Sequence, residues 1–302
     1  MPKVAVGMPV RNGERFLAEA IESILAQTYG DFELVISDNA STDATAEICQ
    51  SYAKRDARIR YIRQKTNIGA AANYNATFRN SSGQYFKWAA HDDLLAPEFI
   101  RECVRVLDEE ESVVLCSPAT ALINEDSSPV AYSPEHKSMV DSYGVRWPVT
   151  PEKNPLLMSA DPADRFSAIL LFMFLCVEVF GLMRRSAAER TSLHRPNVSG
   201  DKIFLAELSL IGRFHLLEQF LFYRRCHRQQ FSATLSAGYQ TMWVSGQKQH
   251  MFLQQLKILA EYSCLALSRQ LTPEQRFQCM SAVWRRGVTR GRPLKRMFSP
   301  VS

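Results

Sequence analysis

The first third of the chain alternates short apolar runs with longer segments in which apolar positions recur with helical spacing. Residues 4–10 form an apolar run that ends at the turn residues Arg11, Asn12 and Gly13, as is typical of a buried strand. Residues 14–27 then place their apolar side chains on one face of a helix. The same pattern predicts strands at 4–10, 32–37, 59–63, 85–89 and 113–116, and helices at 14–27, 44–54, from Gly69 to about Asn80, and 97–109.

Strands that alternate with helices of this length predict βαβ units and a mainly parallel, Rossmann-like α/β sheet flanked by helices. Ligands of such sheets bind beyond the carboxyl ends of the strands. Polar loops follow several of the predicted strands, so we expect loops from separate parts of the chain to meet at one edge of the sheet. These loops are residues 9–12, 37–39, 65–67 and 91–93.

The pattern changes after residue 116. Residues 117–165 are rich in Pro, Ser and acidic side chains and have weak periodicity, which predicts a long irregular excursion such as a lid. Residues 166–183 are the most apolar stretch and predict a buried helix and strand; their uncharged part ends at Glu178 and is shorter than the roughly 20 residues of a membrane span. Further predictions are a helix at 201–210, a strand at 220–225, a helix or helix pair at 240–269 and a helix at 274–284.

Composition and cysteine content indicate the compartment in which the protein is expected to work. The chain has 302 residues, of which 46% are hydrophobic and 22% charged, as in ordinary globular proteins. Its seven cysteines include no CxxC pair, which favours a reducing compartment over a disulfide framework. The first residues read as the beginning of a strand and lack the basic flank and long apolar run of a signal peptide. We therefore expect a cytoplasmic protein.

The net charge of +5 is a mild basic excess, but its distribution is uneven. From residue 271 onward there are seven Arg or Lys residues and one acid, Glu274. Such a segment can contact an anionic membrane surface, or it can be a solvated helix face or a frayed terminus. It lacks the interleaved aromatic residues of single-strand binders, so no nucleic acid is expected. A peripheral contact with the inner membrane through the basic C-terminus remains a hypothesis.

Two adjacent carboxylates, Asp92 and Asp93, directly follow the fourth predicted strand, with His91 beside them. Hard divalent cations bind oxygen ligands and commonly bridge one or two carboxylates to substrate phosphates. The alternative is that these acids cap the next helix, because Pro97 follows shortly. The pair is therefore a candidate metal site at the predicted edge.

Two other edge loops contain groups that suit a nucleotide. Asp38 ends the second predicted strand, where an acid can accept a hydrogen bond from a base or a ribose hydroxyl; the alternative is a helix cap, which fits Asp43 better. The loop of Asn67 and Gly69 either lets its backbone approach a phosphate or ribose or forms a plain turn.

Taken together, these motifs resemble the inverting glycosyltransferases of family 2, which have the GT-A fold. Their order and spacing over the first 100 residues are far more specific than any one of them. The matching stretches are VAVGMPVRNGERFL (4–17), SILAQTY (23–29), FELVISDNASTD (32–43), NIG (67–69), GQYFKW (83–88) and HDDLLAPEF (91–99), and a weaker likeness covers FGLMRRS (180–186), GDKIFLAEL (200–208) and YRRCH (223–227).

The resemblance implies which residues bind the donor. Asp38 matches the acid that contacts the nucleotide base, and Asp92 matches the metal-binding Asp of the DxD motif, whose first Asp falls at Ala90. Because that motif is degenerate, the resemblance implies that ribose and metal contacts either shift to His91 or Asp93 or are lost. The implied binding residues are Pro9, Val10, Arg11, Asn12, Asp38, Asn67, Gly69, His91, Asp92 and Asp93.

The resemblance also implies a catalytic base and a second metal-side residue. Asp201 matches the general base that takes the proton of the acceptor hydroxyl, and Gly200 stands where the family usually has Glu. Asp201 can instead cap a helix. His227 matches a His near the diphosphate or the metal, and its neighbours Arg224, Arg225 and Arg228 suit phosphate. The implied metal ligands are therefore Asp92 and His227, and the metal is Mn²⁺ or Mg²⁺.

The leading hypothesis is transfer of a sugar, with inversion, from a nucleotide diphosphate sugar, UDP-linked, to a hydroxyl of a glycan or a lipid-linked acceptor in cell-surface polysaccharide synthesis. Residues 1–116 are then the nucleotide-sugar half of a GT-A domain, 117–235 its acceptor half, and 236–302 a C-terminal helical extension with a basic tail. One alternative is nucleotidyl transfer, although residues 11–15 contain too little glycine for its phosphate loop. The other is a degenerate, non-catalytic nucleotide-sugar-binding protein.

Overall fold

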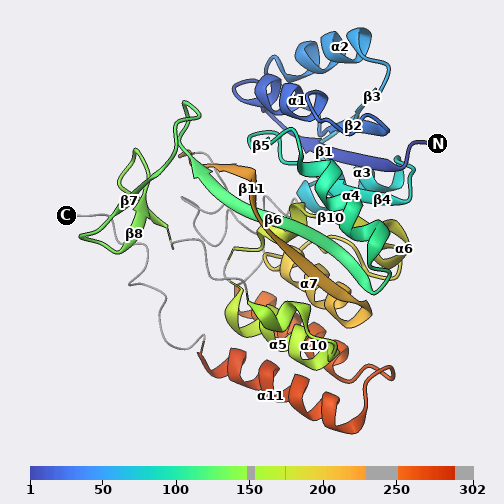
Figure 1. Ribbon diagram of the computed structural model, residues 1–302, viewed down its shortest axis with the longest axis vertical. Coiled ribbons are helices and arrows are strands. Elements are labelled where there is room, and N and C mark those ends of the chain that lie inside the picture. The colour runs from blue at the N-terminus through green and yellow to red at the C-terminus, as the bar shows by residue number, and fades with distance from the viewer. Residues whose placement is uncertain (148–153, 174, 229–250, 290–302) are drawn as a thin grey trace.

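An eight-stranded sheet forms the centre of the molecule (Figure 1), and its strands lie in the order β3-β2-β1-β4-β10-β6-β11-β5. The computed structural model describes residues 1–147, 154–173, 175–228 and 251–289. The strands are β1 (Val4–Val10), β2 (Phe32–Asp38), β3 (Ile59–Arg63), β4 (Tyr85–Trp88), β5 (Leu94–Leu95), β6 (Val113–Ile123), β10 (Leu182–Arg184) and β11 (Arg213–Arg225).

Most neighbouring strands in this sheet are parallel. β1 pairs in parallel with β2 and β4, β2 with β3, and β6 with β11. Only β10 and β5 run against their neighbours. Val10 lies beside Asp38, and Asp38 beside Arg63, so the carboxyl ends of three strands are level. The predicted mixed, mainly parallel sheet is confirmed.

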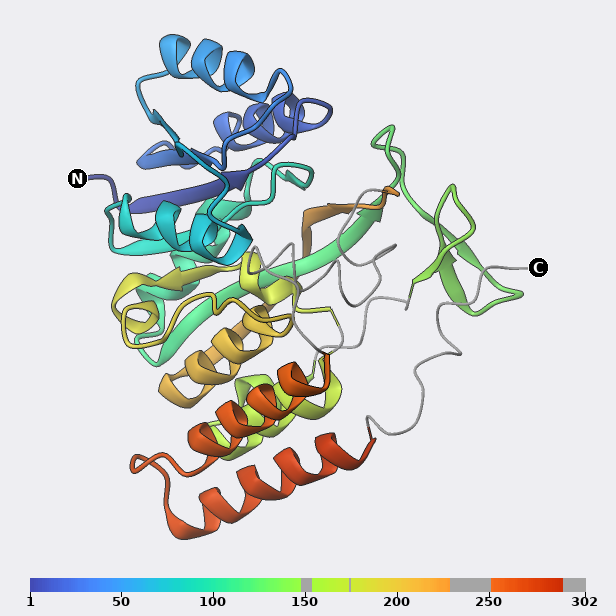
Figure 2. The same ribbon diagram turned by 180° about the vertical axis from the view of Figure 1, so that it is seen from behind.

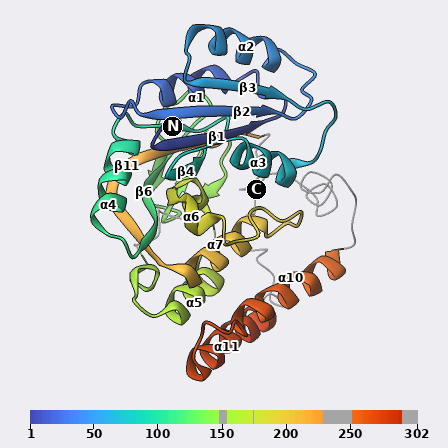
Figure 3. The same ribbon diagram turned by 90° about the vertical axis from the view of Figure 1, so that its right-hand side faces the viewer.

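Helices cover both faces of the sheet (Figure 3). One face carries α1 (Leu17–Leu25), α2 (Thr45–Arg55) and α4 (Phe99–Glu109), which share a core with the alternate β1 residues Val4, Val6 and Met8. The opposite face carries α3 (Ala70–Arg79), α5 (Pro162–Phe172), α6 (Arg185–Ala188) and α7 (Gly200–Ile211), and its core contains Phe86 and Trp88. Each face therefore buries one side of the same strands.

Two predicted helices begin later than their apolar spacing suggested. The helix predicted at 14–27 begins at Leu17, because the carbonyl of Gly13 accepts hydrogen bonds from the amides of both Phe16 and Leu17, each at 3.1 Å, and closes a turn first. The helix predicted at 97–109 begins at Phe99. This helix ends at Glu109, as the sequence predicted.

The prediction of an irregular excursion at 117–165 is wrong for much of its length. β6 continues to Ile123 because β11 lies parallel to it and supplies backbone partners as far as the pair Arg225 and Ile123. Beyond it, a three-stranded sheet of β7 (Ala131–Ser133), β8 (Ser138–Val140) and β9 (Arg146–Trp147) stands away from the main sheet in Figure 1. The helical segments η1 (Pro155–Met158) and α5 follow.

β11 is also longer than its predicted bounds of 220–225, because it begins at Arg213. The prediction of a buried helix and strand within 166–183 is confirmed by α5 and β10, which the short helix η2 (Val177–Phe180) separates. The predicted helix at 201–210 is α7.

Two helices close the described part of the chain, α10 (Met251–Ala266) and α11 (Pro273–Thr289), and Figure 2 shows them side by side. α11 packs on α5, and α10 on α7. Thr272 and Gln275 form a reciprocal cap at the start of α11, with side chain to backbone distances of 3.3 and 3.0 Å. The predicted helix at 240–269 lies outside the described residues in its first part, 240–250. None of the helices described combines the length and apolarity that crossing a bilayer requires.

Candidate functional site

The loops after β1 and β2 meet at the carboxyl edge of the sheet and are tied together. The side-chain oxygen of Asn12 accepts a hydrogen bond from the amide of Thr42 at 2.9 Å, and the amide of Asn12 donates to the hydroxyl of Ser41 at 3.0 Å. Asn12 and Ala40 both have positive φ angles, 52° and 56°, which the mutual contacts hold in place. The prediction that separate polar loops lie together at this edge is therefore confirmed.

The β1 residues predicted to line the nucleotide differ in exposure. Pro9 and Val10 are buried within the sheet, whereas Arg11 is exposed at its edge. The backbone oxygen of Val10 accepts the amide of Asn39 at 2.8 Å, which brings the loop after β2 close. Of the three, only Arg11 presents its side chain to solvent.

Asp38 lies at the end of β2, where the sequence predicted a contact to the base, but its carboxylate is completely buried. One oxygen accepts the amide of Ser41 and the other accepts the hydroxyl of Tyr61, both at 2.8 Å. Burial, followed by the hydrogen bond to Asp38, raises the pKa of Tyr61 above its ordinary value, so this hydroxyl stays a donor. A base could contact Asp38 only by displacing Tyr61. In the structure Asp38 holds the loop instead.

The loop after β3 is joined to the same edge by an amide pair. Asn39 donates to the side-chain oxygen of Asn67 at 2.9 Å and accepts from the amide of Ile68 at 2.8 Å. Gly69 has a φ of 82°, a conformation that favours glycine, and it starts α3. The loop is thus a braced turn at the carboxyl edge of the sheet.

The three residues after β4 separate into different roles. Asp92 is partly exposed, and its carboxylate lies 2.9 Å from Nε2 of His227. Asp93 is buried and accepts the backbone amide of Arg225 at 2.9 Å. The ring of His91 lies against Gly13, where an added Cβ would approach it within 2.6 Å. Asp92 is therefore the carboxylate of the pair that faces outward.

The pKa values of Asp92 and Asp93 are shifted in opposite directions. Burial opposes the charge of Asp92, but nearby His91 and the hydrogen bond to His227 outweigh it and hold the pKa of Asp92 below its ordinary value. Burial, and then the charge of Asp92, raise the pKa of Asp93. Asp92 is thus the better anionic oxygen ligand.

These groups fit a divalent cation that substrate phosphates help to bind. His227 lies beside Asp92, and its Nδ1 is buried and has no hydrogen-bond partner within residues 1–147, 154–173, 175–228 and 251–289. No group of three His, Cys, Asp or Glu side chains that could hold a metal occurs among the described residues. A single carboxylate, completed by diphosphate oxygens, agrees with the way Mg²⁺ is usually bound.

The burial of Arg225 contradicts one prediction. The sequence suggested that it binds phosphate, but its guanidinium is fully buried and hydrogen-bonded within the protein. Nε donates to the backbone oxygen of Asp92 at 2.8 Å, and the two Nη atoms donate to the carbonyl of Glu125 at 2.8 Å and the carboxylate of Glu19 at 2.6 Å. Arg225 therefore fixes the backbone that carries Asp92. The flanking cations lie over aromatic rings, Arg224 on Trp147 and Arg228 on Tyr143.

Asp201 lies in the first turn of α7 with its side chain 57% exposed. Burial, and then the charges of Asp201, Asp92 and Asp93 in that order, raise the pKa of Tyr74 of α3 well above its ordinary value, so all three carboxylates lie near its hydroxyl. The structure thus brings Asp201 to the same site as the carboxylates that follow β4.

Two residues of the site were missed by sequence reasoning, Tyr74 and His194. Nδ1 of His194 lies 3.0 Å from the Asp201 carboxylate, and its ring packs on that of Tyr74 with centroids 4.5 Å apart. A lone His seven positions before an acid, with Pro196 and Gly200 between them, has no helical periodicity that indicates a contact.

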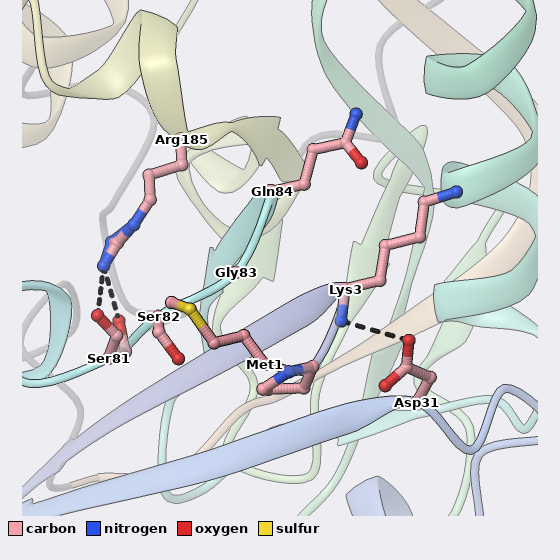
Figure 4. Close-up of a pocket in the computed structure, with 9 residues that line it drawn as sticks. Met1, Lys3, Asp31, Ser81, Ser82, Gly83, Gln84 and Arg185 are labelled. Atoms are coloured by element: carbon pink, nitrogen blue, oxygen red, sulfur yellow. Dashed lines mark hydrogen bonds between the residues drawn. The ribbon is translucent and has the colours of Figure 1, made fainter.

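A cavity of about 500 Å³ lies at the other end of the sheet, before β1 and β4 (Figure 4). Its polar groups bind one another: the amide of Lys3 donates to Asp31 at 3.2 Å, and Arg185 donates to Ser81. The cavity contains none of the predicted site residues.

Comparison with known proteins gives a matching family and solved structures of the same fold. The family model described as glycosyl transferase family 2 matches residues 5–189. An uncharacterized glycosyltransferase of Rickettsia typhi, RT0329, is 36% identical over 118 residues, which are 38% of this chain and 36% of that protein. The match thus spans little more than a third of that relative's length.

Two solved structures have the same fold. The crystal structure of Staphylococcus aureus TarS 1–349 in complex with UDP-GlcNAc aligns over 95% of this chain and 73% of that one, with a TM-score of 0.67 and 17% identity. The mannosyltransferase PcManGT of Pyrobaculum calidifontis, in complex with GDP-Man and Mn²⁺, aligns over 95% and 75%, with a TM-score of 0.54 and 15% identity. At these identities the likeness concerns the fold alone.

Proposed function

The chain belongs to glycosyl transferase family 2, and on that premise we propose that it moves a sugar, with inversion, from a nucleotide diphosphate sugar to an acceptor hydroxyl. The observation that carries the proposal is that Asp92, which is paired with His227, and Asp201 both lie near Tyr74. We propose that residues 1–116 bind the donor, 117–235 face the acceptor and 236–302 form the helical extension.

The donor is proposed to be a UDP-sugar, held at the edge formed by the loops after β1, β2, β3 and β4. UDP-GlcNAc is bound in the TarS structure, and GDP-Man with Mn²⁺ in that of PcManGT, which supports a nucleotide sugar and a metal here. A Mn²⁺ or Mg²⁺ ion held by Asp92 and His227 would neutralise charge on the leaving diphosphate. Arg225 keeps the Asp92 backbone in place for this contact.

The proton chemistry is proposed for Asp201. The acceptor oxygen forms a bond to the anomeric carbon while the bond from that carbon to the diphosphate oxygen breaks. The acceptor proton passes to the Asp201 carboxylate, and the nucleoside diphosphate leaves with the bonding electron pair. An exposed carboxylate at the start of a helix can meet an incoming hydroxyl, and the carboxylate of Asp92, beside His227, is kept for the donor.

Nucleotide binding tests the first half of this proposal. A ligand that binds only the native state raises its melting temperature, so UDP with Mn²⁺ should raise Tm by several degrees. GDP, dTDP and CDP with Mn²⁺ should raise it less, and UDP with EDTA least of all. Thermal-shift measurements on the full chain check this. Equal shifts with all four nucleotides, or none with any, would contradict the assignment of the donor.

The acceptor is proposed to be a glycan or a lipid-linked unit of a cell-surface polysaccharide, met at the membrane surface. α11 supports this because two large apolar side chains on its surface, Phe277 and Trp284, are 79% and 69% exposed and lie seven residues apart. Arg285 is exposed beside Trp284, and the sequence beyond the helix adds Arg290 and Arg292. Exposed aromatic and basic side chains together are typical of helices that bind anionic membrane interfaces.

Liposome binding tests that contact. At low salt the full chain should co-sediment with phosphatidylglycerol vesicles and much less with phosphatidylcholine vesicles, because the basic residues attract anionic headgroups. Trp284→Ala should weaken binding. Phe220→Ala is the control, since Phe220 is 55% exposed on β11, away from α11. Equal binding by the Trp284 variant and the wild type would remove the support from α11.

A further inference from the structure

The proposed base has a buried partner that the reaction described above does not use. His194 is 6% exposed and lies in the segment between α6 and α7. Its Nδ1 is 3.0 Å from Oδ1 of Asp201, whose side chain is 57% exposed. A buried imidazole therefore contacts an exposed carboxylate from the protein side.

Aromatic rings surround the imidazole. Ring centroids lie 4.4 Å away for Trp88, 4.5 Å for Tyr74 and 5.9 Å for Phe204, which is nearly parallel to the imidazole at 14°. In the described part of the chain, Nε2 of His194 is buried and has no hydrogen-bond partner. The tautomer with its proton on Nδ1 fits both Asp201 and the aromatic rings. It donates a hydrogen bond to Asp201 through Nδ1, and it has no N–H on the Nε2 atom that lacks an acceptor.

The backbone of His194 is held by one side chain from the nucleotide half. Asn75 of α3 accepts the amide of His194 at 3.0 Å and donates to its carbonyl at 2.9 Å. Asn75 is itself 8% exposed. The preceding residue, Leu193, has a φ of 56°, which is unfavourable for a branched residue and persists only where surrounding contacts enforce it. The clamp therefore fixes where the imidazole lies.

The rest of the segment is anchored on two helices. Arg195 bonds Glu207 of α7 at 3.0 Å, and Asn197 donates to Glu261 of α10 at 3.3 Å. The carbonyl of Arg195 lies so close to Gly200 that an added Cβ would approach it within 2.6 Å. No side chain therefore fits at Gly200 while this segment is in place. The polar group that contacts Asp201 comes from His194 instead.

From these contacts we propose that His194 is a positioning residue for Asp201. It holds the carboxylate in the orientation that receives the acceptor proton, and Asn75 holds His194 in turn. The inference rests on the proposed role of Asp201 as the base. An exposed side chain at a helix start otherwise exchanges among rotamers, and small misplacements of a reacting group are costly in rate.

The kinetic test compares two substitutions of the imidazole. His194→Leu should lower kcat by roughly 10- to 100-fold with KM for the donor unchanged, because only the base loses its orientation. His194→Asn should recover most of kcat, since its amide N–H can take the place of Nδ1–H. UDP release from UDP-N-acetylglucosamine, UDP-glucose and UDP-galactose with Mn²⁺ gives both constants.

The matched control is His215→Leu. Nδ1 of His215 lies 3.1 Å from Glu110 in a similar pair on β11, with no contact to the site. This variant should keep the wild-type kcat. A His194→Asn variant as slow as His194→Leu, with both folded by thermal melt, would mean that the imidazole acts through packing alone.

A spectroscopic measurement is independent of turnover. In protein labelled with ¹⁵N at its six histidines, long-range ¹H–¹⁵N correlations should assign the Nδ1–H tautomer to His194, and Asp201→Asn should shift its Nδ1 resonance. An Nε2–H tautomer in the wild type would overturn the inference.

The outcomes separate this inference from the function on which it rests. If Asp201→Asn keeps wild-type turnover, the proposed base is wrong. If Asp201→Asn is inactive while His194→Leu has the wild-type kcat, only the positioning role fails.

Discussion

Asp201→Asn should lower the transfer rate by about 10²- to 10⁴-fold, the usual contribution of a general base. The amide has nearly the shape of the carboxylate but cannot accept the acceptor proton. Because Asp201 is 57% exposed at the start of α7, little folding free energy depends on it. The variant should therefore bind UDP and Mn²⁺ with the wild-type thermal shift while its kcat collapses.

The same experiment distinguishes the competing functions. Wild-type protein that binds UDP but releases none from any UDP-sugar would indicate a non-catalytic binding protein. Release of pyrophosphate from a nucleoside triphosphate and a sugar phosphate would indicate nucleotidyl transfer. Asp164→Asn is a suitable control, because Asp164 also lies in the first turn of a helix, α5, where its carboxylate accepts the hydroxyl of Ser159 at 2.9 Å.

Asp92→Asn should abolish the Mn²⁺-dependent part of UDP binding and reduce transfer by at least about 10²-fold. Loss of a group that merely supports a metal ligand costs 10- to 100-fold in affinity or activity, so loss of the ligand itself should cost no less. The amide keeps the possibility of a hydrogen bond to His227, which limits damage to the fold. The difference in Tm between UDP with Mn²⁺ and UDP with EDTA measures the effect.

A control for charge is available at the opposite end of the sheet. Asp31→Asn removes the same charge beside Lys3, where no predicted site residue lies, and should leave the Mn²⁺ effect intact. An Asp92→Asn protein that retains the full Mn²⁺-dependent shift would place the metal elsewhere.

The first half of the sheet was predictable because its central strands are buried over their whole length. β1 and β4 are buried at every position and, apart from Lys87, consist of apolar residues, and the polar loops that follow them had to lie at the carboxyl edge. Asp92 could be singled out for that reason. The sequence around Asp92 alone indicated both the strand β4 and the position at which this strand ends.

The second half was not predictable in the same way. The later part of β6 contains Ser117 and Thr120 and pairs with β11 about a hundred residues later, so its strand character comes from a distant partner. His194 reaches Asp201 because Asn75, 119 residues earlier, holds its backbone. The deep burial of Asp38 and Arg225 depends on Tyr61 and Glu19 in the same way.

The anchoring of Arg225 has a practical consequence for engineered hybrids of such enzymes. Its guanidinium binds the carbonyl of Glu125 but the carboxylate of Glu19, so one partner is backbone that any residue supplies and the other is a particular side chain. A designer who exchanges residues 124–129 after β6 for those of a relative can vary Glu125, provided that the chain bends at the same place and that Ser127 is kept, because its hydroxyl accepts a hydrogen bond from the same Nη atom of Arg225 at 2.9 Å. Exchange of α1 without β11 should instead leave a buried cation unpaired, so these two elements have to be transplanted together.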